Sequence, residues 1–317
     1  MITHEQILTL LNIRGLDWNT VEEVCRGVSR TQNIHRAPSE DIEDFFDLME
    51  KVIGPELEGG VAVPEYDDFR KANEKAKHIL SESERRGIGV ISRFDKAFPF
   101  NLRYTVDESG RRAAPLLLYY KGNLSITEQP ALAVIGTRTP TPDAMKAGRT
   151  YAESFASIGV NIVSGLAPGC DTAGHRGALD AGGVTTAFLA QGLDTVDSPL
   201  AEEILAKGGL LMSEYPVGEA VRARNLVSRD RLQAGLADAV LVVQTGVKGG
   251  TMHAVRAAKA SNDPLSNKPL IVVDYHDNQG EIGEGNLLLK REGAIVLPDN
   301  PADLDAECDR CAEIIWP

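Results

Sequence analysis

The sequence lacks the features of a membrane protein, a secreted protein and a disulfide-stabilised scaffold. It has no uninterrupted apolar run of the roughly 18 residues that a membrane-spanning helix needs. Its first residues, Met-Ile-Thr-His-Glu-Gln, have neither the basic start nor the apolar core of a signal peptide. Four cysteines in 317 residues are too few for a disulfide framework. These absences predict a soluble, cytoplasmic protein with no membrane partner.

An excess of basic charge is also missing. The chain has 33 Lys and Arg against 46 Asp and Glu, a formal net charge of −13. General polyanion binders usually carry a basic surface, so this balance argues against one, although it leaves room for a local basic pocket. Residues 1–86 carry 11 basic and 18 acidic residues, whereas residues 87–317 carry 22 and 28. This uneven distribution favours two modules with different surfaces.

The first module, residues 1–86, is predicted to be helical. The composition of the whole chain, 43% hydrophobic and 25% charged, is typical of a globular protein. Thr20 and Ser39 are candidate N-caps of two helices, and residues 67–86 form a long charged helix. No catalytic cluster occurs here, so we expect a small docking module.

The second module, residues 87–317, alternates strands and helices about five times. Apolar strand candidates at 131–135, 161–164, 185–190 and 239–243 are each followed by a glycine-containing loop or a helical segment. This alternation predicts an α/β fold with right-handed crossovers and a mostly parallel sheet. Ligands of such sheets bind at the carboxyl ends of the strands, near the point where the strand order switches.

The first glycine loop, Gly136-Thr137-Arg138, directly follows a strand. Glycine lets a ligand approach the backbone, the following helix N-terminus offers unpaired N–H groups, and Arg138 offers a planar fork of donors suited to phosphate. The dinucleotide fingerprint G-x-G-x-x-G and the Walker A motif are absent here. The loop alone is therefore also compatible with an ordinary strand-to-helix turn.

The second loop supplies Ser164, Gly165, Gly169 and Asp171, with His175 one helical turn further on. Asp171 and His175 are spaced to pair on one helix face, which would either fix the loop or support acid–base chemistry. The structural role is the favoured interpretation.

The third loop is Lys248-Gly249-Gly250-Thr251, which opens a helix. A phosphate or sugar ligand suits this loop, although a tight turn would have the same sequence.

Several motifs occur in one fixed order. They are Lys121-Gly-Asn, Ala-Val-Ile-Gly-Thr-Arg at 133–138, Val-Ser-Gly-Leu-Ala-Pro-Gly-Cys-Asp-Thr-Ala-Gly-His-Arg-Gly-Ala-Leu at 163–179, Gly192-Leu-Asp, Leu-Met-Ser-Glu-Tyr-Pro at 211–216, and Arg-Asp-Arg-Leu-Gln-Ala-Gly-Leu at 229–236. In order and spacing they resemble the DNA-processing protein A family, also called DprA or Smf, over roughly residues 87–297.

The resemblance implies an extended Rossmann-like fold, with helices on both faces of the sheet, that binds single-stranded DNA. Members of the family protect incoming strands, help load the RecA recombinase during natural transformation and DNA recombination, and usually form a dimer. It therefore implies a DNA-binding homodimer with no catalytic activity, no cofactor and no metal. A C-terminal winged-helix domain, frequent in the family, is not expected in this chain.

Positions that match the family's DNA-binding loops are Gly136, Thr137 and Arg138 in the first loop; Ser164, Gly165, Gly169 and Asp171 in the second; Arg229 and Arg231, which match the two arginines of an Arg-Asn-Arg motif; and Lys248, Gly249, Gly250 and Thr251 in the third.

Three departures from the family pattern are expected to weaken strand binding. Pro168 replaces an arginine, Asp230 places a carboxylate between the two arginines, and Leu226 replaces an aromatic residue. Stacking of a base on an aromatic ring is worth about 1–3 kcal/mol. Arg222 and Arg224 are expected to strengthen strand binding, because they would form a local basic stripe with the two arginines of the motif.

The alternative interpretation is a Rossmann-like nucleotide-binding sensor, with a small nucleotide as ligand and a role such as defence against foreign DNA. A nucleotide hydrolase is less favoured. Glycosidic hydrolysis needs a positioned carboxylate, and no Asp or Glu follows Gly249-Gly250-Thr251 within one turn. Glu214 is the one nearby candidate.

The pair Cys308 and Cys311 has the C-x-x-C spacing of a zinc ligand pair, but the sequence offers no second pair. We therefore expect no zinc site, and the charged flanking residues predict an exposed helix.

Overall fold

The structure is a computed structural model of the chain and describes residues 2–35, 41–56, 63–275 and 280–316. The chain divides into two compact units, Met1–Phe98 with Leu116–Leu118 and Pro99–Pro115 with Tyr119–Pro317. The division after residue 86 stays a prediction, because compactness does not show that either fragment folds alone. In the described part of the chain, no helix is both long enough and apolar enough to cross a membrane.

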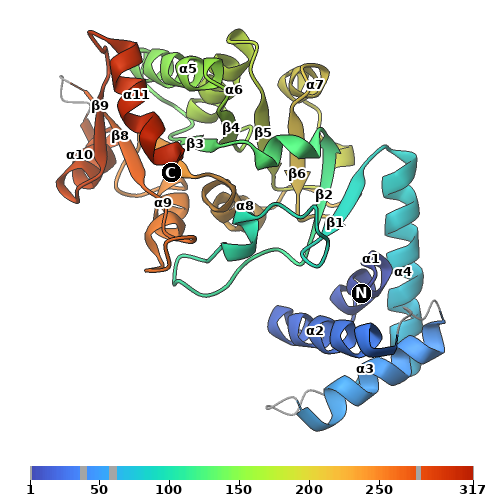
Figure 1. The fold of residues 1–317 in the computed structure, drawn as a ribbon. Helices are drawn as coiled ribbons and strands as arrows, with labels where there is room; N and C mark the ends of the chain where they lie inside the picture. Colours follow the sequence, from blue (N-terminus) through green and yellow to red (C-terminus); the bar gives the residue numbers. More distant parts are fainter. Residues whose placement is uncertain (1, 36–40, 57–62, 276–279, 317) are drawn as a thin grey trace. The chain divides into compact units, whose positions relative to one another are not determined.

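The first unit is mainly helical. Its elements are α1 (His4–Leu11), α2 (Trp18–His35), α3 (Ile42–Glu56), α4 (Tyr66–Arg85) and the strand β1 (Gly89–Ser92) (Figure 1). Helix α2 begins before Thr20, whose backbone N–H donates to Asp17 at 2.8 Å, so Thr20 is not the cap. Ser39, the predicted cap of the next helix, lies outside the described residues.

The helices of the first unit bury apolar faces against one another. Phe45 of α3 packs on Phe69 of α4 with ring centroids 5.3 Å apart, and Met49 one turn further along α3 is fully buried. The guanidinium of Arg93 pairs with Glu22 at 2.6 Å, and both side chains are about nine-tenths buried. Both charges are therefore neutralised locally.

The second unit contains most of a nine-stranded sheet. The strand order is β1-β2-β6-β5-β4-β3-β7-β8-β9. Strands β2 to β9 are Leu117–Gly122, Ala131–Ile135, Asn161–Ser164, Thr185–Leu189, Leu210–Ser213, Ala239–Val242, Leu270–Asp274 and Ile295–Pro298. Strand β2 is antiparallel to β6, and the pairings from β6 to β9 are parallel. The predicted α/β fold, with a mostly parallel sheet and N-terminal helices, is confirmed.

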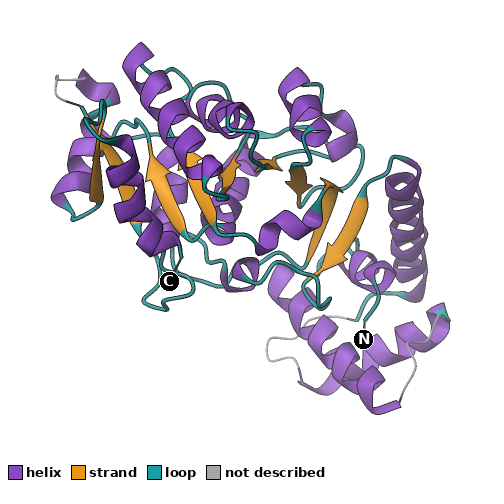
Figure 2. Cartoon of the chain, turned by 45° about the horizontal axis from the view of Figure 1, so that its top comes forward, coloured by secondary structure: helices purple, strands orange, loops and turns teal. Residues whose placement is uncertain are grey.

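Helices cover both faces of this sheet (Figure 2). They are α5 (Pro142–Ser157), α6 (Cys170–Asp180), α7 (Pro199–Ala206), α8 (Ala223–Leu236), α9 (Thr251–Lys259), α10 (Glu284–Arg291) and α11 (Leu304–Ile315). Helices α5, α6 and α11 lie over one face, and α8 and α9 lie over the other (Figure 1). Helix α8 begins at Ala223, six residues before the motif at 229–236, and α10 was not predicted from the sequence.

The strand order reverses beside β3. This strand pairs with β4 on one side and with β7 on the other, so successive strands run outward in opposite directions. All five residues of β3 are buried, which explains its continuous apolar sequence. The loops that leave the carboxyl ends of β3 and β7 therefore diverge and leave room for a ligand between them.

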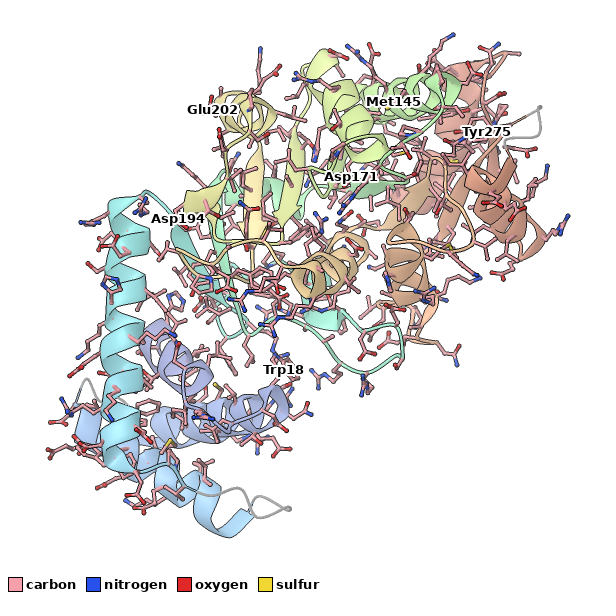
Figure 3. All side chains as sticks on the ribbon, turned by 180° about the vertical axis from the view of Figure 1, so that it is seen from behind. Trp18, Met145, Asp171, Asp194, Glu202 and Tyr275 are labelled. Atoms are coloured by element: carbon pink, nitrogen blue, oxygen red, sulfur yellow. The ribbon has the colours of Figure 1, made fainter. Side chains whose placement is uncertain are left out.

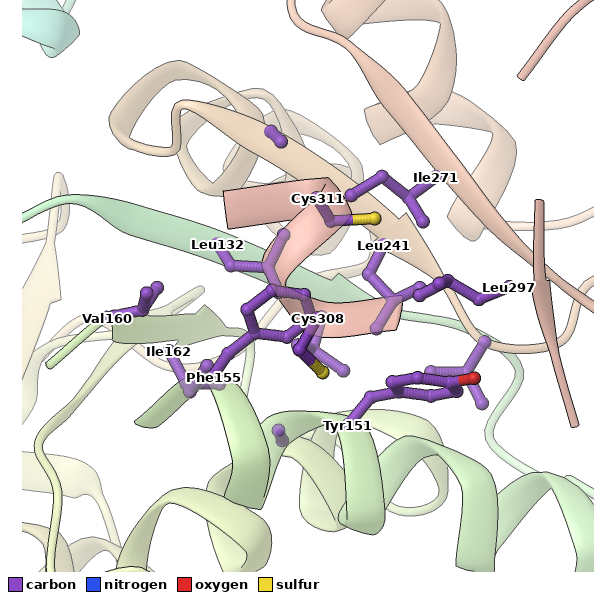
Figure 4. Packing of buried hydrophobic residues seen from close by; sticks show 14 of the residues in the cluster. Leu132, Tyr151, Phe155, Val160, Ile162, Leu241, Ile271, Leu297, Cys308 and Cys311 are labelled. Atoms are coloured by element: carbon purple, nitrogen blue, oxygen red, sulfur yellow. The ribbon is translucent and has the colours of Figure 1, made fainter. Parts of the chain in front are cut away.

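A hydrophobic core lies between the sheet and helices α5 and α11. Phe155 and Tyr151 of α5 meet Leu241 of β7 in this core, and Cys308 and Cys311 line the buried face of α11 (Figure 4). The helix around the cysteines was predicted correctly, but both cysteines are buried, at 3% and 0% exposure. They are free thiols that act as small apolar side chains here, and burial raises the pKa of Cys311 to about 11.

We expect Phe155→Ala to lower the free energy of unfolding by about 3–5 kcal/mol, because the ring is completely buried and its removal leaves a cavity. Chemical denaturation followed by circular dichroism measures the change. The control is Ile158→Ala at the end of the same helix, where the side chain is 45% exposed and the change should stay within about 0.5 kcal/mol. Equal effects of the two substitutions would contradict this assignment of the core.

Candidate functional site

A pocket of about 420 Å³ opens at the carboxyl edge of the sheet in the second unit. Its lining comes from the loops after β3, β4 and β7, from α8 and from the start of α9. The volume lies in the range of small-ligand sites. Gly136, Thr137 and Arg138 of the first loop line it, together with Asp171 at the start of α6 and Arg229 of α8.

The backbone of the first loop is held by its neighbours. The N–H of Thr137 donates to the carbonyl of Gln244 at 2.8 Å, and the N–H of Cys170 donates to the carbonyl of Thr137 at 3.1 Å. The side-chain amide oxygen of Gln244 accepts from the N–H of Thr141 at 2.9 Å. These bonds leave the side chain of Arg138 exposed, with no hydrogen bond or ion pair to any described residue.

The second loop is organised by the carboxylate of Asp171, which lies in the interior of the second unit (Figure 3). Its Oδ2 accepts from the N–H of Gly165 at 3.1 Å and from the N–H of Ala167 at 3.3 Å. Between these two amides, Leu166 has a φ of 59°, in the left-handed region that favours glycine. Burial raises the pKa of Asp171, while Arg229 and the loop amides oppose that rise. Asp171 therefore fixes the loop, as the structural interpretation predicts.

His175 does not pair with Asp171. Its Nδ1 lies 2.7 Å from the hydroxyl of Thr185, and that hydroxyl donates its proton to the carbonyl of Ile162. The hydroxyl therefore accepts from the Nδ1–H of the ring. Burial lowers the pKa of His175 to about 3, so the ring is neutral at physiological pH. This histidine is structural and does not line the pocket.

The two arginines of the Arg-Asp-Arg motif have protein partners. Arg229 is only 3% exposed, and its Nη1 donates to the carbonyls of Gly165 and Phe188, each at 2.5 Å. Its Nε donates to Asp230 at 3.1 Å. A Cβ on Gly165 would lie 2.0 Å from the Arg229 guanidinium, so glycine at 165 makes room for protein rather than for a ligand.

Arg231 does not line the pocket. It forms a two-fold ion pair with Glu214, with N–O distances of 2.8 and 2.6 Å, and its Nε donates to the carbonyl of Ala113 at 2.9 Å. Glu214 is therefore engaged through both oxygens and does not line the pocket. Ser164 is also engaged, because its hydroxyl donates to the carbonyl of Val134 at 2.6 Å.

Arg222 and Arg224 lie at the start of α8 and are exposed. Arg222 pairs with Glu219 at 3.0 Å. Neither side chain lines the pocket, so the structure does not join the four arginines into one continuous stripe facing the cavity.

The third loop does border the pocket. Lys248, Gly249, Gly250 and Thr251 all line it, and the first three are exposed. Lys248 forms no hydrogen bond or ion pair with a described residue. Helix α9 begins at Thr251, and no side chain caps its N-terminal N–H groups.

A second pocket, of about 430 Å³, adjoins the first. It is lined by residues of the loops after β4, β5 and β6, and it shares Arg138, Ala167, Leu226 and Arg229 with the first pocket. The exposed Arg138 therefore borders both cavities, which together form a longer groove than either alone.

Part of the pocket lining was not predicted from the sequence. Gln233 of α8 and the residues Thr245 and Gly246, which follow β7, also border the first pocket. Thr245 and Gly246 come just after the predicted strand at 239–243, which was an available signal. Gln233 lies within the motif at 229–236, but its residue type did not single it out there. Within the described ranges, no group of three or more His, Cys, Asp or Glu side chains is arranged to hold a metal ion.

Sequence comparisons identify relatives of the second unit. A family model described as DNA recombination-mediator protein A matches residues 89–304. Protein Smf of Escherichia coli is 32% identical over 238 residues, which are 73% of this chain and 59% of that protein. Protein Smf of Synechocystis sp. is 36% identical over 202 residues, 58% of this chain and 50% of that protein. The chain thus spans about half to three-fifths of the length of these curated relatives.

Two solved structures share the fold. The X-ray structure of DNA processing protein A from Streptococcus pneumoniae has a TM-score of 0.69 and 25% identity, covering 93% of this chain and 95% of that one. A structure concerning the single-stranded DNA binding mode of the Helicobacter pylori protein has a TM-score of 0.58 and 26% identity, covering 71% of this chain and 96% of that one. Because the family model matches more than half of the sequence, the chain belongs to the DNA recombination-mediator protein A family, the DprA/Smf family.

Proposed function

We propose that this protein binds single-stranded DNA along the groove at the carboxyl edge of its sheet. The observation that carries the proposal is the distribution of charge in the pocket. Arg138 and Lys248 are exposed on the rim and have no protein partner among the described residues, whereas Arg229 is engaged inside. Exposed cations beside the N-terminus of a helix suit the phosphates of a DNA strand.

Membership in the family supports this proposal, as does the Helicobacter pylori relative, whose structure concerns single-stranded DNA binding. The shape of the site agrees with it. Two adjoining cavities that share Arg138 suit a ligand longer than one nucleotide. The residues we assign to the strand are Arg138 and Lys248, together with the backbone N–H groups of Arg138 and of the loop at 249–251.

The wider role follows from the same family. We propose that the protein acts by binding rather than by catalysis, that it forms a homodimer, and that it protects single strands and passes them to the RecA recombinase during recombination or DNA uptake. In this proposal the acidic module at residues 1–86 docks a partner protein.

The alternative ligand is a small nucleotide, because the first pocket alone has the volume of a small-ligand site. Hydrolysis of such a nucleotide through Glu214 has no support in the geometry, since both oxygens of that carboxylate bind Arg231.

We expect Arg138→Ala to weaken the binding of a labelled oligothymidine and to reduce its dependence on salt. Each phosphate contact contributes about 0.7 to the slope of log K against log salt for a single strand, so the slope should fall by about that amount. Fluorescence anisotropy at several salt concentrations measures both quantities. Arg291→Ala is the matched control, because this exposed arginine at the end of α10 lines neither cavity.

Wild-type protein that fails to bind the oligonucleotide at about 100 mM salt would overturn the proposal. A thermal-shift screen with nucleotides then tests the alternative, because a ligand that binds only the folded state raises the melting temperature.

We expect Arg229→Ala to act mainly on stability. Removing this buried guanidinium leaves the carboxylates of Asp171 and Asp230 uncompensated, and the loss of one buried partner typically costs about 3–5 kcal/mol. Denaturant titration measures this loss, and Arg138→Ala should show almost none. An Arg229→Ala protein of unchanged stability that no longer binds DNA would instead place Arg229 in the strand-binding surface.

A further inference from the structure

The carboxylate of Asp230 is a buried polar group that the protein itself satisfies only in part. It lines the first pocket, and its side chain is 15% exposed. Its Oδ1 accepts from the Nε of Arg229 at 3.1 Å and from the side-chain nitrogen of Gln233 at 3.4 Å. Its Oδ2 accepts no hydrogen bond from any described residue. An acceptor in a pocket wall with spare capacity is positioned to receive donors from a ligand.

The charges around Asp230 determine which part of a nucleotide can face it. Arg229 of the same helix lies beside it, Asp171 of α6 adds a second negative charge, and His253 of α9 is the remaining titratable group whose charge acts on it. The unpaired cations, Arg138 and Lys248, belong to the loops at the rim. A phosphate is repelled by the carboxylate and attracted to the rim, so the base is the part that enters the pocket.

The rest of the wall suits a base as well. Leu226, Val227 and Ala254 line the same pocket and give it apolar surface from two helices, α8 and α9. Apolar and aliphatic side chains pack against the face of a base, while a side-chain acceptor reads its edge. The pocket therefore offers a base both an apolar contact and one directional polar contact.

The bases differ in what they offer to a carboxylate. On the Watson–Crick edge, guanine presents two adjacent donors, the N1–H and the N2 amino group. Thymine presents one N–H between two carbonyl oxygens, and adenine and cytosine each present an amino group next to an acceptor nitrogen. A carboxylate has acceptor sites only, so two adjacent donors fit it and a neighbouring acceptor is repelled.

Resting on the proposed strand binding, we propose that this pocket reads one base of the strand and that Asp230 selects guanine. The phosphates remain at the rim, and the base lies inward with its two donors on the carboxylate. Asp230 is then a specificity residue, distinct from the cations that bind every sequence.

Protonation gives this selection a defined pH dependence. Burial, with a smaller contribution from Asp171, raises the pKa of Asp230 to about 6, while Arg229 and His253 oppose the rise. Above that pKa the group is an ionised acceptor and prefers guanine. Below it the group is protonated, donates from one oxygen and loses the preference. The charge of His253 also acts on Asp230, and this imidazole contacts Glu108 and Arg256.

The test uses the whole protein and short oligothymidines in which a few positions carry 7-deazaguanine, inosine, adenine or cytosine. The 7-deaza base keeps both donors and prevents quadruplex formation, and inosine lacks the N2 amino group. At about pH 8, we expect 7-deazaguanine to bind roughly tenfold more tightly than thymine, adenine or cytosine, with inosine between them. In the Asp230→Asn protein the guanine preference should disappear. The control is Asp309→Asn, which removes an exposed carboxylate on α11 and should leave the preference unchanged.

The outcomes separate this inference from the proposed function. Equal, salt-sensitive binding of all the oligonucleotides overturns base reading and leaves strand binding intact, whereas no binding of any oligonucleotide overturns both. For wild-type protein at about pH 5, the guanine preference should shrink to a few-fold at most. Since that measurement needs no substitution, it stays decisive if Asp230→Asn does not fold, and an unchanged preference at that pH would also count against Asp230.

Discussion

The buried guanidinium of Arg229 is the interaction on which the organisation of the site depends. It donates to the carbonyl of Gly165 in the loop after β4 and to that of Phe188 in β5, and it pairs with Asp230 on its own helix. Its charge also stabilises the ionised form of Asp171, which in turn holds the amides of the second loop. One positive charge thus ties α8 to the carboxyl ends of two strands.

This arrangement divides the cations of the site into two groups. Arg229 and Arg231 neutralise buried or half-buried carboxylates and hold helix α8 in place. Arg138 and Lys248 lie on two loops at the pocket rim. Both side chains are exposed and remain available to a ligand. The acidic net charge of the chain is therefore compatible with anion binding, because attraction depends on which charges lack an internal partner.

The fold was largely predictable because its signals are local. Continuous apolar runs such as 131–135 and 239–243 became fully buried strands, and the three glycine loops follow strands as the alternation predicted. The errors occurred where local signals compete. The start of helix α8 at Ala223 was not recognised from the sequence, because the residues from Ala223 to Ser228 lack the apolar periodicity of a helix. The charged neighbours of Cys308 concealed that the cysteine face of α11 packs into the core.

The amino-acid sequence by itself determined the family, the alternating α/β pattern and the three loops that border the site, since each depends on residue order and spacing. Only the tertiary structure decided the role of each charged residue in those loops. Arg138 and Arg229 look equivalent in the sequence, yet the side chain of Arg138 is exposed, whereas that of Arg229 is buried and donates hydrogen bonds to two backbone carbonyls. Burial and partner geometry arise from segments far apart in the chain, and the sequence pattern around a residue does not encode them.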